Sequence, residues 1–185
     1  MAARVLRLTE FGDPILKRRS RKVTRAFRES LEYKKLIADM SRVLRSAKGV
    51  GLAAPQVGIP LRLALIEARP TPERPETAAI SRMVVINPTI SEYHGTPRLK
   101  WEGCLSFNKA FGKVPRYNSV TVEYEDEMGV RITKRASGLL AHIFQHEVDH
   151  LDGIRFIDRM ESAESLVTAT EYRKSKAKKA KKAAR

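Results

Sequence analysis

The residues His146-Glu147-Val148-Asp149-His150 constrain the fold more than any other part of the sequence. Residues four apart project from the same face of an α-helix, so both imidazoles can reach one metal ion, and Glu147 lies close enough to reach a water there without being a ligand. We therefore predict a helix over about 138–152, with Ser137 as its N-cap and Gly153 at its end, carrying a metal site on one face. The residues expected on its core face are Leu140, Phe144, Val148 and Leu151.

The third ligand of such a site has few candidates, because the chain has four histidines and one cysteine. A hydrolytic site usually combines three protein ligands with an open position for water. His94, His142, an acidic residue and Cys104 are the choices. His142 continues the helical stripe, but three histidines in line rarely converge on one ion. A lone cysteine is ordinarily an inert buried residue, so these residues alone leave the third ligand open.

The remaining pattern predicts a single α+β domain of short antiparallel or mixed β-strands around the central metal-binding helix, with N-terminal and C-terminal helices. We expect a catalytic domain over 1–165, followed over 166–185 by a helix and a flexible basic tail. The other expected elements are a helix over 25–47 that Gly49 stops, a loop over 49–60, a strand over 61–68, a loop over 69–77, a strand over 83–90 that breaks or ends near Asn87-Pro88, a hairpin of 119–124 and 130–134, and a helix from Ala163.

The charge distribution suggests an anionic partner. The net charge is +15, and residues 173–185 hold eight basic residues and no acid. This tail either contacts RNA or a ribosome or is simply solvated, and the sequence leaves both interpretations open. No apolar run is long enough to span a bilayer. We expect no membrane contact, and a cytoplasmic location fits a chain with one cysteine and no signal-type start.

Three segments together resemble the peptide deformylase family. They read GVGLAAPQ over 49–56, EGCLS over 102–106 and QHEVDH over 145–150, and their order and spacing match the family's three motifs. The likeness continues to about residue 160. Three motifs in register are far more specific than one.

This resemblance implies an enzyme that removes the formyl group from N-formylmethionine at the start of nascent chains. By the family pattern Cys104, His146 and His150 hold one divalent metal ion. That ion is expected to be Fe²⁺ in the cell, with Zn²⁺, Ni²⁺ or Co²⁺ as alternatives, because one thiolate and two imidazoles suit several borderline metals. A metal-bound water attacks the formyl carbon, and Glu147 acts as general base and then general acid.

The resemblance also supplies the residues around the metal. The oxyanion is stabilised by the side-chain amide of Gln56 and the backbone N–H of Leu105. Arg116 supports the site by pairing with Glu102. The family pattern places the substrate contacts at Val50, Gly51, Glu102, Leu139, His142 and Ile143.

One departure from the family lies beside the cysteine motif. Phe107 and Asn108 stand where a small aliphatic residue and a proline are usual. That segment is expected to border the substrate cleft, so the departure bears on substrate preference. The alternative functions are a metallopeptidase or an amidase for another N-acyl group, and an inactive ribosome- or RNA-binding homologue. Gln56 and the Cys104 motif favour the deformylase.

Overall fold

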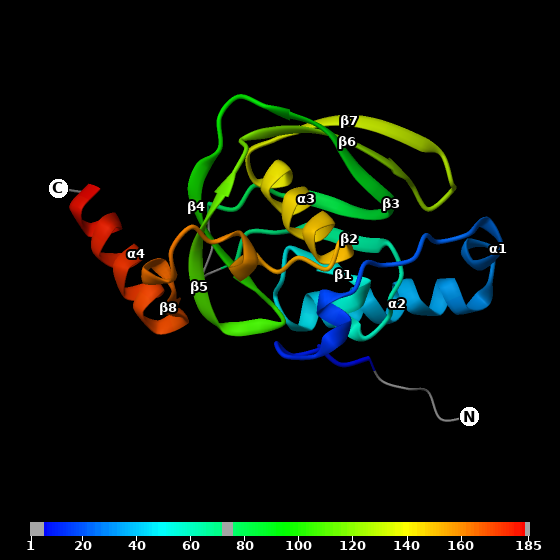
Figure 1. The fold of residues 1–185 in the computed structure, drawn as a ribbon, viewed down its shortest axis with the longest axis horizontal. Helices are drawn as coiled ribbons and strands as arrows, with labels where there is room; N and C mark the ends of the chain where they lie inside the picture. Colours follow the sequence, from blue (N-terminus) through cyan, green and yellow to red (C-terminus); the bar gives the residue numbers. More distant parts are fainter. Residues whose placement is uncertain (1–5, 72–75, 184–185) are drawn as a thin grey trace.

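The computed structural model describes residues 6–71 and 76–183, with the side chains of 108–109 and 179–183 also outside the description. Part of the loop predicted over 69–77 and the last two residues of the predicted tail therefore lie outside it. Figure 1 shows the chain as two sheets around a central helix, α3. In chain order the elements are η1 (Pro14–Lys17), α1 (Arg25–Arg28), α2 (Leu31–Ser46), β1 (Gly51–Ala53), η2 (Ala54–Val57), β2 (Leu63–Ala68), β3 (Ile80–His94), β4 (Arg98–Cys104), β5 (Phe107–Arg116), β6 (Ser119–Glu125), β7 (Arg131–Ser137), α3 (Gly138–Leu151), η3 (Phe156–Arg159), η4 (Ala163–Ser165), β8 (Val167–Thr168) and α4 (Ala169–Ala183).

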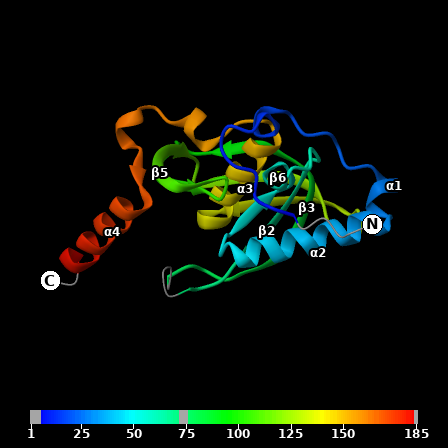
Figure 2. The ribbon, with the colours of Figure 1, turned by 90° about the horizontal axis from the view of Figure 1, so that it is seen from below.

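The larger sheet has the strand order β1-β2-β3-β6-β7, and its neighbouring strands are antiparallel. Helices α2 and α3 cover its opposite faces, which Figure 2 shows from below. Successive side chains of β2 point to opposite faces of the sheet and so contribute to the core on both sides. Leu63 and Leu65 pack in the core cluster of α2, whereas Ile66 packs in the cluster that contains Phe144 of α3. The predicted α+β class is thus confirmed.

Helix α3 occupies Gly138–Leu151, as predicted. Ser137 is its N-cap, although its side chain makes no capping hydrogen bond. Gly153 follows the helix with φ +77°, and a Cβ there would lie 2.6 Å from the Lys17 carbonyl oxygen, so this close turn requires glycine. The buried Arg62 donates to Asp152 Oδ1 at 2.7 Å and to the Pro88 carbonyl at 2.9 Å, which fixes the end of the helix against β3.

The helix predicted over 25–47 is wrong as a single element, because α1 ends before Ser30 and α2 begins after it. Ser30 Oγ accepts from the Tyr33 N–H at 3.2 Å and donates to the Phe27 carbonyl at 2.6 Å. The serine therefore starts a new helix.

Three further expectations needed correction. The predicted loop over 49–60 contains β1, which pairs with β2 through Gly51 and Ile66, and the turn η2. The strand predicted over 83–90 is longer, Ile80–His94, and the predicted break near Asn87 is an irregularity in its pairing with β6 and not its end. At this irregularity Asn87 has φ +52° and its side chain bonds both backbone groups of Val23. The last helix begins at Ala169 rather than Ala163.

The smaller sheet, β4-β5-β8, carries the C-terminal helix. Tyr172 of α4 stacks on Phe111 of β5, with ring centroids 4.2 Å apart, and contacts Trp101 of β4 at 5.3 Å. Beyond this anchor α4 projects away from the body (Figures 1 and 2). Of the helices that the structure describes, none has both the length and the apolar character needed to cross a membrane.

Candidate active site

Two chain segments bring the expected metal ligands together. Cys104 is the last residue of β4, and His146 and His150 lie one turn apart on α3. Their ligand atoms all lie within 4.8 Å of one another. Cys104 Sγ is 3.2 Å from His150 Nε2, which is 3.2 Å from His146 Nε2. His94, one of the alternatives, instead contacts Thr121 on β6.

The buried carboxylate of Glu102 orients His146. Oε1 of Glu102 lies 2.5 Å from His146 Nδ1 and accepts from Arg116 Nη2 at 2.8 Å. Burial raises the pKa of Glu102, but the charges and hydrogen bonds of His146, Arg116 and His142 outweigh it and hold that pKa well below its usual range. An ionised carboxylate only accepts, so Nδ1 of His146 carries the proton and Nε2 faces the cluster.

The state of Cys104 suits a metal ligand. Burial opposes ionisation of the thiol, but the neighbouring imidazoles of His150 and His146 outweigh it, so the pKa of Cys104 lies well below its ordinary value. The thiolate is the form that binds metals. One thiolate and two imidazole nitrogens that converge at this distance fit a divalent ion of borderline softness.

Glu147 lies beside this cluster with its carboxyl buried. Its side chain is only 3% exposed, and Oε2 has no hydrogen-bond partner among the described residues. Burial raises the pKa of Glu147 to about 7, against the opposing effect of His146 and His150. A carboxyl with a pKa near neutrality can take up and release a proton in one reaction cycle.

Gly51 of β1 makes room for that carboxyl. A Cβ built on Gly51 would lie 2.2 Å from Glu147 Oε1 and 2.9 Å from Ile143 Cγ2. Only glycine lets the edge strand β1 approach α3 this closely. The first glycine-rich motif therefore contributes directly to the shape of the site.

Gln56 is held with its amide nitrogen toward the cluster. Its Oε1 accepts from the Ala53 N–H at 2.8 Å, which leaves Nε2 to donate to Cys104 Sγ at 3.3 Å and to Ser106 Oγ at 3.4 Å. The side chain is almost fully buried. Leu105 follows Cys104 in the turn between β4 and β5. Both expected oxyanion donors therefore lie next to the thiolate.

The expected substrate residues come from the segment at β1, from β4 and from α3. Val50 and Leu139 pack, half-buried, against the core cluster that includes Ile143. His142 lies 2.7 Å from the second oxygen of Glu102. Glu102 itself is only 5% exposed, and its oxygens contact Arg116, His142 and His146. Its observed contacts are thus those of a brace for the ligands.

The ring of Phe107, a residue expected to border the substrate cleft, lies against two other aromatic rings. Its ring packs between Phe11, at 4.7 Å, and Phe156, at 5.8 Å. These rings line a small hollow on the side of Cys104 and His150 that Glu147 does not line. The side chain of Asn108 lies outside the described residues. Phe107 therefore lines a hollow beside Cys104 and His150, and its effect on substrate preference stays a prediction.

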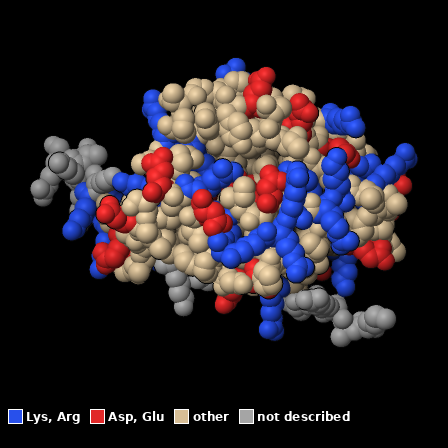
Figure 3. All heavy atoms as spheres, viewed as in Figure 1, with Lys and Arg blue, Asp and Glu red and all other residues tan. Residues whose placement is uncertain are grey.

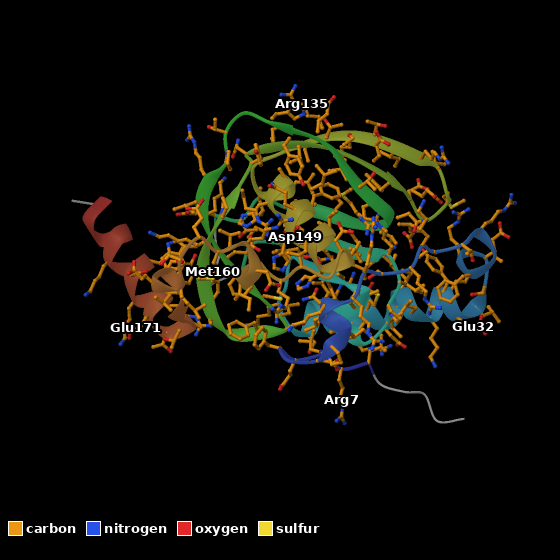
Figure 4. The ribbon with its side chains drawn as sticks, viewed as in Figure 1. Arg7, Glu32, Arg135, Asp149, Met160 and Glu171 are labelled. Atoms are coloured by element: carbon orange, nitrogen blue, oxygen red, sulfur yellow. The ribbon has the colours of Figure 1, made fainter. Side chains whose placement is uncertain are left out.

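Two charged residues of the site were not recognised from sequence. Asp149, between the two histidines, accepts from Arg116 Nη1 at 2.6 Å and from Arg159 Nη2 at 2.7 Å. Figure 4 labels Asp149 at the centre of the molecule, on α3. No sequence signal marked Asp149 as buried, because it lies away from the core face predicted for the helix, yet it is only 6% exposed. Nothing in the sequence pointed to Arg159.

Comparison with known proteins agrees with this site. Residues 5–165 match the model of the polypeptide deformylase family. A peptide deformylase of Opitutus terrae is 41% identical over 166 residues, covering 84% of this chain and 85% of that protein. The chain therefore belongs to the polypeptide deformylase family, whose members are metal-dependent enzymes that remove the N-formyl group from nascent peptides.

Solved structures give the same result. The class I type b peptide deformylase of Acinetobacter baumannii, bound to Met-Ala-Ser, superposes with a TM-score of 0.81 at 36% identity, covering 86% of this chain and all of that one. The peptide deformylase of Synechococcus elongatus, in complex with actinonin, has a TM-score of 0.77 at 37% identity, covering 89% and 85%. The family that the three motifs indicated is confirmed.

Proposed function

We propose that the Cys104–His146–His150 cluster holds one divalent ion, Fe²⁺ in the cell, and that the site hydrolyses the formyl group of N-formylmethionyl peptides with Glu147 as the acid–base residue. The observation that carries the proposal is the buried carboxyl of Glu147, with an oxygen that has no hydrogen-bond partner among the described residues, beside three converging ligand residues. A bound divalent ion acts as a Lewis acid that lowers the pKa of water and polarises a carbonyl oxygen.

Glu147 performs the proton transfers. Its carboxylate takes a proton from the attacking water, and the carboxylic acid then donates it to the departing amine. A pKa near 7 makes both steps accessible at neutral pH. The unpartnered Oε2 is the atom at which we place the proton.

Gln56 and Leu105 stabilise the negative charge that develops on the formyl oxygen. The Ala53 N–H holds the Gln56 amide so that its NH₂ faces the site before substrate arrives. The Leu105 backbone N–H supplies the second donor. Donors placed in advance need no reorganisation during the reaction, and loss of one typically costs about 10²–10³ in rate.

The substrate peptide lies along β1, and its methionine side chain packs against the apolar side chains of Val50, Leu139 and Ile143. β1 is the outermost strand of its sheet, so its second edge can pair with an extended peptide near Gly51. His142 lies at the rim of this pocket and contacts Glu102.

The test is formate release by protein purified without oxygen and loaded separately with Fe²⁺, Ni²⁺, Co²⁺ or Zn²⁺. Formyl-Met-Ala-Ser should be hydrolysed, whereas acetyl-Met-Ala-Ser should not. Failure of every metal form to release formate would refute the proposal, and equal hydrolysis of the acetyl peptide would indicate a broader amidase. Metal analysis of protein isolated without oxygen tests the assignment of iron.

We further propose that residues 166–185, which β8 and Tyr172 anchor to β5, bring the enzyme to ribosomes in the cytoplasm. The side chains of residues 173–178 are exposed, and four of them are basic. Figure 3 shows basic side chains on α4 and a second group over the N-terminal segment. Only the helix presents its charges on an arm that projects from the body, where RNA phosphates can surround it.

Co-sedimentation with ribosomes at several salt concentrations tests this role. Replacing Arg173, Lys174, Lys176 and Lys178 by glutamine should weaken binding and flatten its salt dependence, while formate release from free peptides stays unchanged. The control replaces Lys17, Arg18, Arg21 and Lys22 and so removes equal charge. Equal loss in both variants would show that net charge alone determines binding, and loss in neither would refute the ribosome contact.

A further inference from the structure

A chain of buried charges connects the metal-ligand cluster to the protein surface. Glu102 of β4 contacts His146, Arg116 of β5 contacts Glu102, Asp149 of α3 contacts Arg116, and Arg159 of η3 contacts Asp149. Four separate elements thus meet in one network. Its outermost member, Arg159, plays no part in the proposed chemistry.

The three inner residues do not balance their charges. Glu102 and Asp149 are two carboxylates, and Arg116 is one guanidinium, and each is less than a tenth exposed. Arg116 is shared between them: Nε and Nη2 donate to Glu102 at 2.8 Å, and Nη1 donates to Asp149 at 2.6 Å. Glu102 also contacts His142 and His146, whereas among the described residues the cations that contact Asp149 are Arg116 and Arg159. A buried charge without a partner is strongly unfavourable, so Asp149 in particular favours a cation besides the shared Arg116.

Arg159 supplies that cation. Its Nη2 donates to Asp149 Oδ1 at 2.7 Å, and its Nε lies 3.3 Å from Oδ2. The side chain is 43% exposed, so it reaches the network from the surface. With Arg159 in place Arg116 can serve Glu102 with two of its nitrogens, which holds the acceptor of His146 Nδ1 in one position.

We propose that Arg159 is a positioning residue for the metal centre. By neutralising Asp149 it keeps Arg116 directed at Glu102, and Glu102 in turn keeps Nε2 of His146 directed at the ion. This inference rests on the proposed metal site. If this inference is right, the native protein loses its metal more slowly than a variant in which Arg159 no longer donates to Asp149 through Nε and Nη2.

The chain offers a matched control on the same segment. Arg155 pairs with Asp158 through Nε at 2.8 Å and Nη2 at 2.6 Å, just before the turn that ends at Arg159. Asp158 makes no contact with the network among the described residues. Removing the Arg155 fork therefore removes an arginine–aspartate pair near η3 without disturbing Asp149.

The experiment compares R159Q, R159K and R155Q with the native protein, each loaded with Co²⁺. The thiolate-to-cobalt absorption band is followed after addition of excess chelator, well below the unfolding temperature. Outer contacts of metal ligands typically affect metal binding about 10–100-fold. We expect R159Q to lose cobalt about tenfold faster, at the lower end of that range, because four contacts separate Arg159 from His146. R159K should be intermediate, because it keeps the charge but loses the fork, and R155Q should match the native protein.

Kinetics provide an independent readout. A positioning role lowers kcat of R159Q and leaves KM for a formyl-Met peptide unchanged, whereas a merely structural role lowers only the unfolding temperature. Cobalt loss from R159Q within twofold of R155Q would overturn the inference. A native protein that binds no cobalt would instead refute the proposed metal site, so the two failures are distinguishable.

Discussion

Replacing Gly51 by alanine tests how the first motif contributes to catalysis. The new methyl group would lie 2.2 Å from Glu147 Oε1, 2.8 Å from Glu147 Cδ and 2.9 Å from Ile143 Cγ2. Ordinary contact needs about 3.4 Å or more, so the carboxyl must move by about 1 Å. A displacement of that size at a catalytic group can cost about 10²-fold in rate, which is about 2.7 kcal/mol in the activation free energy.

The assay is formate release at saturating peptide, beside metal content and unfolding temperature. We expect kcat of Gly51→Ala to fall about 100-fold, with metal retained and a stability loss of about 1–3 kcal/mol from overpacking. Gly112→Ala is the control, because its Cβ would press on Met160 Sδ at 2.6 Å, which belongs to a flexible side chain. That variant should lose stability and keep kcat.

A double variant separates the proposed cause from other effects of the methyl group. If Gly51→Ala acts through Glu147, then adding it to Glu147→Gln should lower kcat little further, because both changes remove one function. A further 100-fold loss in the double variant would refute the reasoning. So would a kcat for Gly51→Ala within threefold of the native value.

The remaining predictions concern the acid–base group, a ligand and an ion pair outside the site. Glu147→Gln should keep its metal and lose about 10²–10⁴ in kcat; substantial turnover would contradict the acid–base role. Cys104→Ala should lower metal content and activity together, and unchanged metal content would place the third ligand elsewhere. Burial raises the pKa of Glu67, but Arg45 and Arg69 outweigh it and hold that pKa below its ordinary 4.5. The ion pairs therefore stabilise the fold above pH 4.5, and this contribution is lost as the pH falls through the folded pKa. Glu67→Gln should lower the free energy of unfolding by under about 1 kcal/mol at neutral pH, since both arginines are largely exposed. Denaturant melts at about pH 3 should show no difference between the variant and the native protein, and a difference that persists there would contradict the assignment.

Helix α3 could be predicted from sequence because the spacing of its residues and the residues at its end indicate the same element. Apolar residues recur at helical spacing on one face of α3, the two histidines lie on another face, and Gly153 follows the end of the helix. The β6–β7 hairpin was predictable for the same reason, since alternating residues flank a polar turn. Where periodicity and turn residues point to the same element, the sequence is sufficient.

Other elements are determined by contacts that sequence does not display. β1 contains glycine and alanine rather than branched residues, and it is a strand because Gly51 pairs with Ile66 and fits beneath Glu147. β4 and β5 carry charges where a core strand would be apolar. Glu102 and Arg116 are buried there because they neutralise each other, and such pairs form only across a completed hairpin.

The two glutamates of the site show what sequence alone could not decide. Glu102 and Glu147 both lie near the ligands and both are buried. Arg116 and two histidines surround Glu102 and keep its pKa low, so it stays an acceptor that orients His146. Glu147 has one oxygen without a partner and faces a glycine, so burial dominates and its pKa is about 7. The surroundings shift the pKa values of these two carboxyl groups in opposite directions, and this difference assigns their roles. The carboxylate of Glu102 orients the ligand His146, and the carboxyl of Glu147 carries the proton.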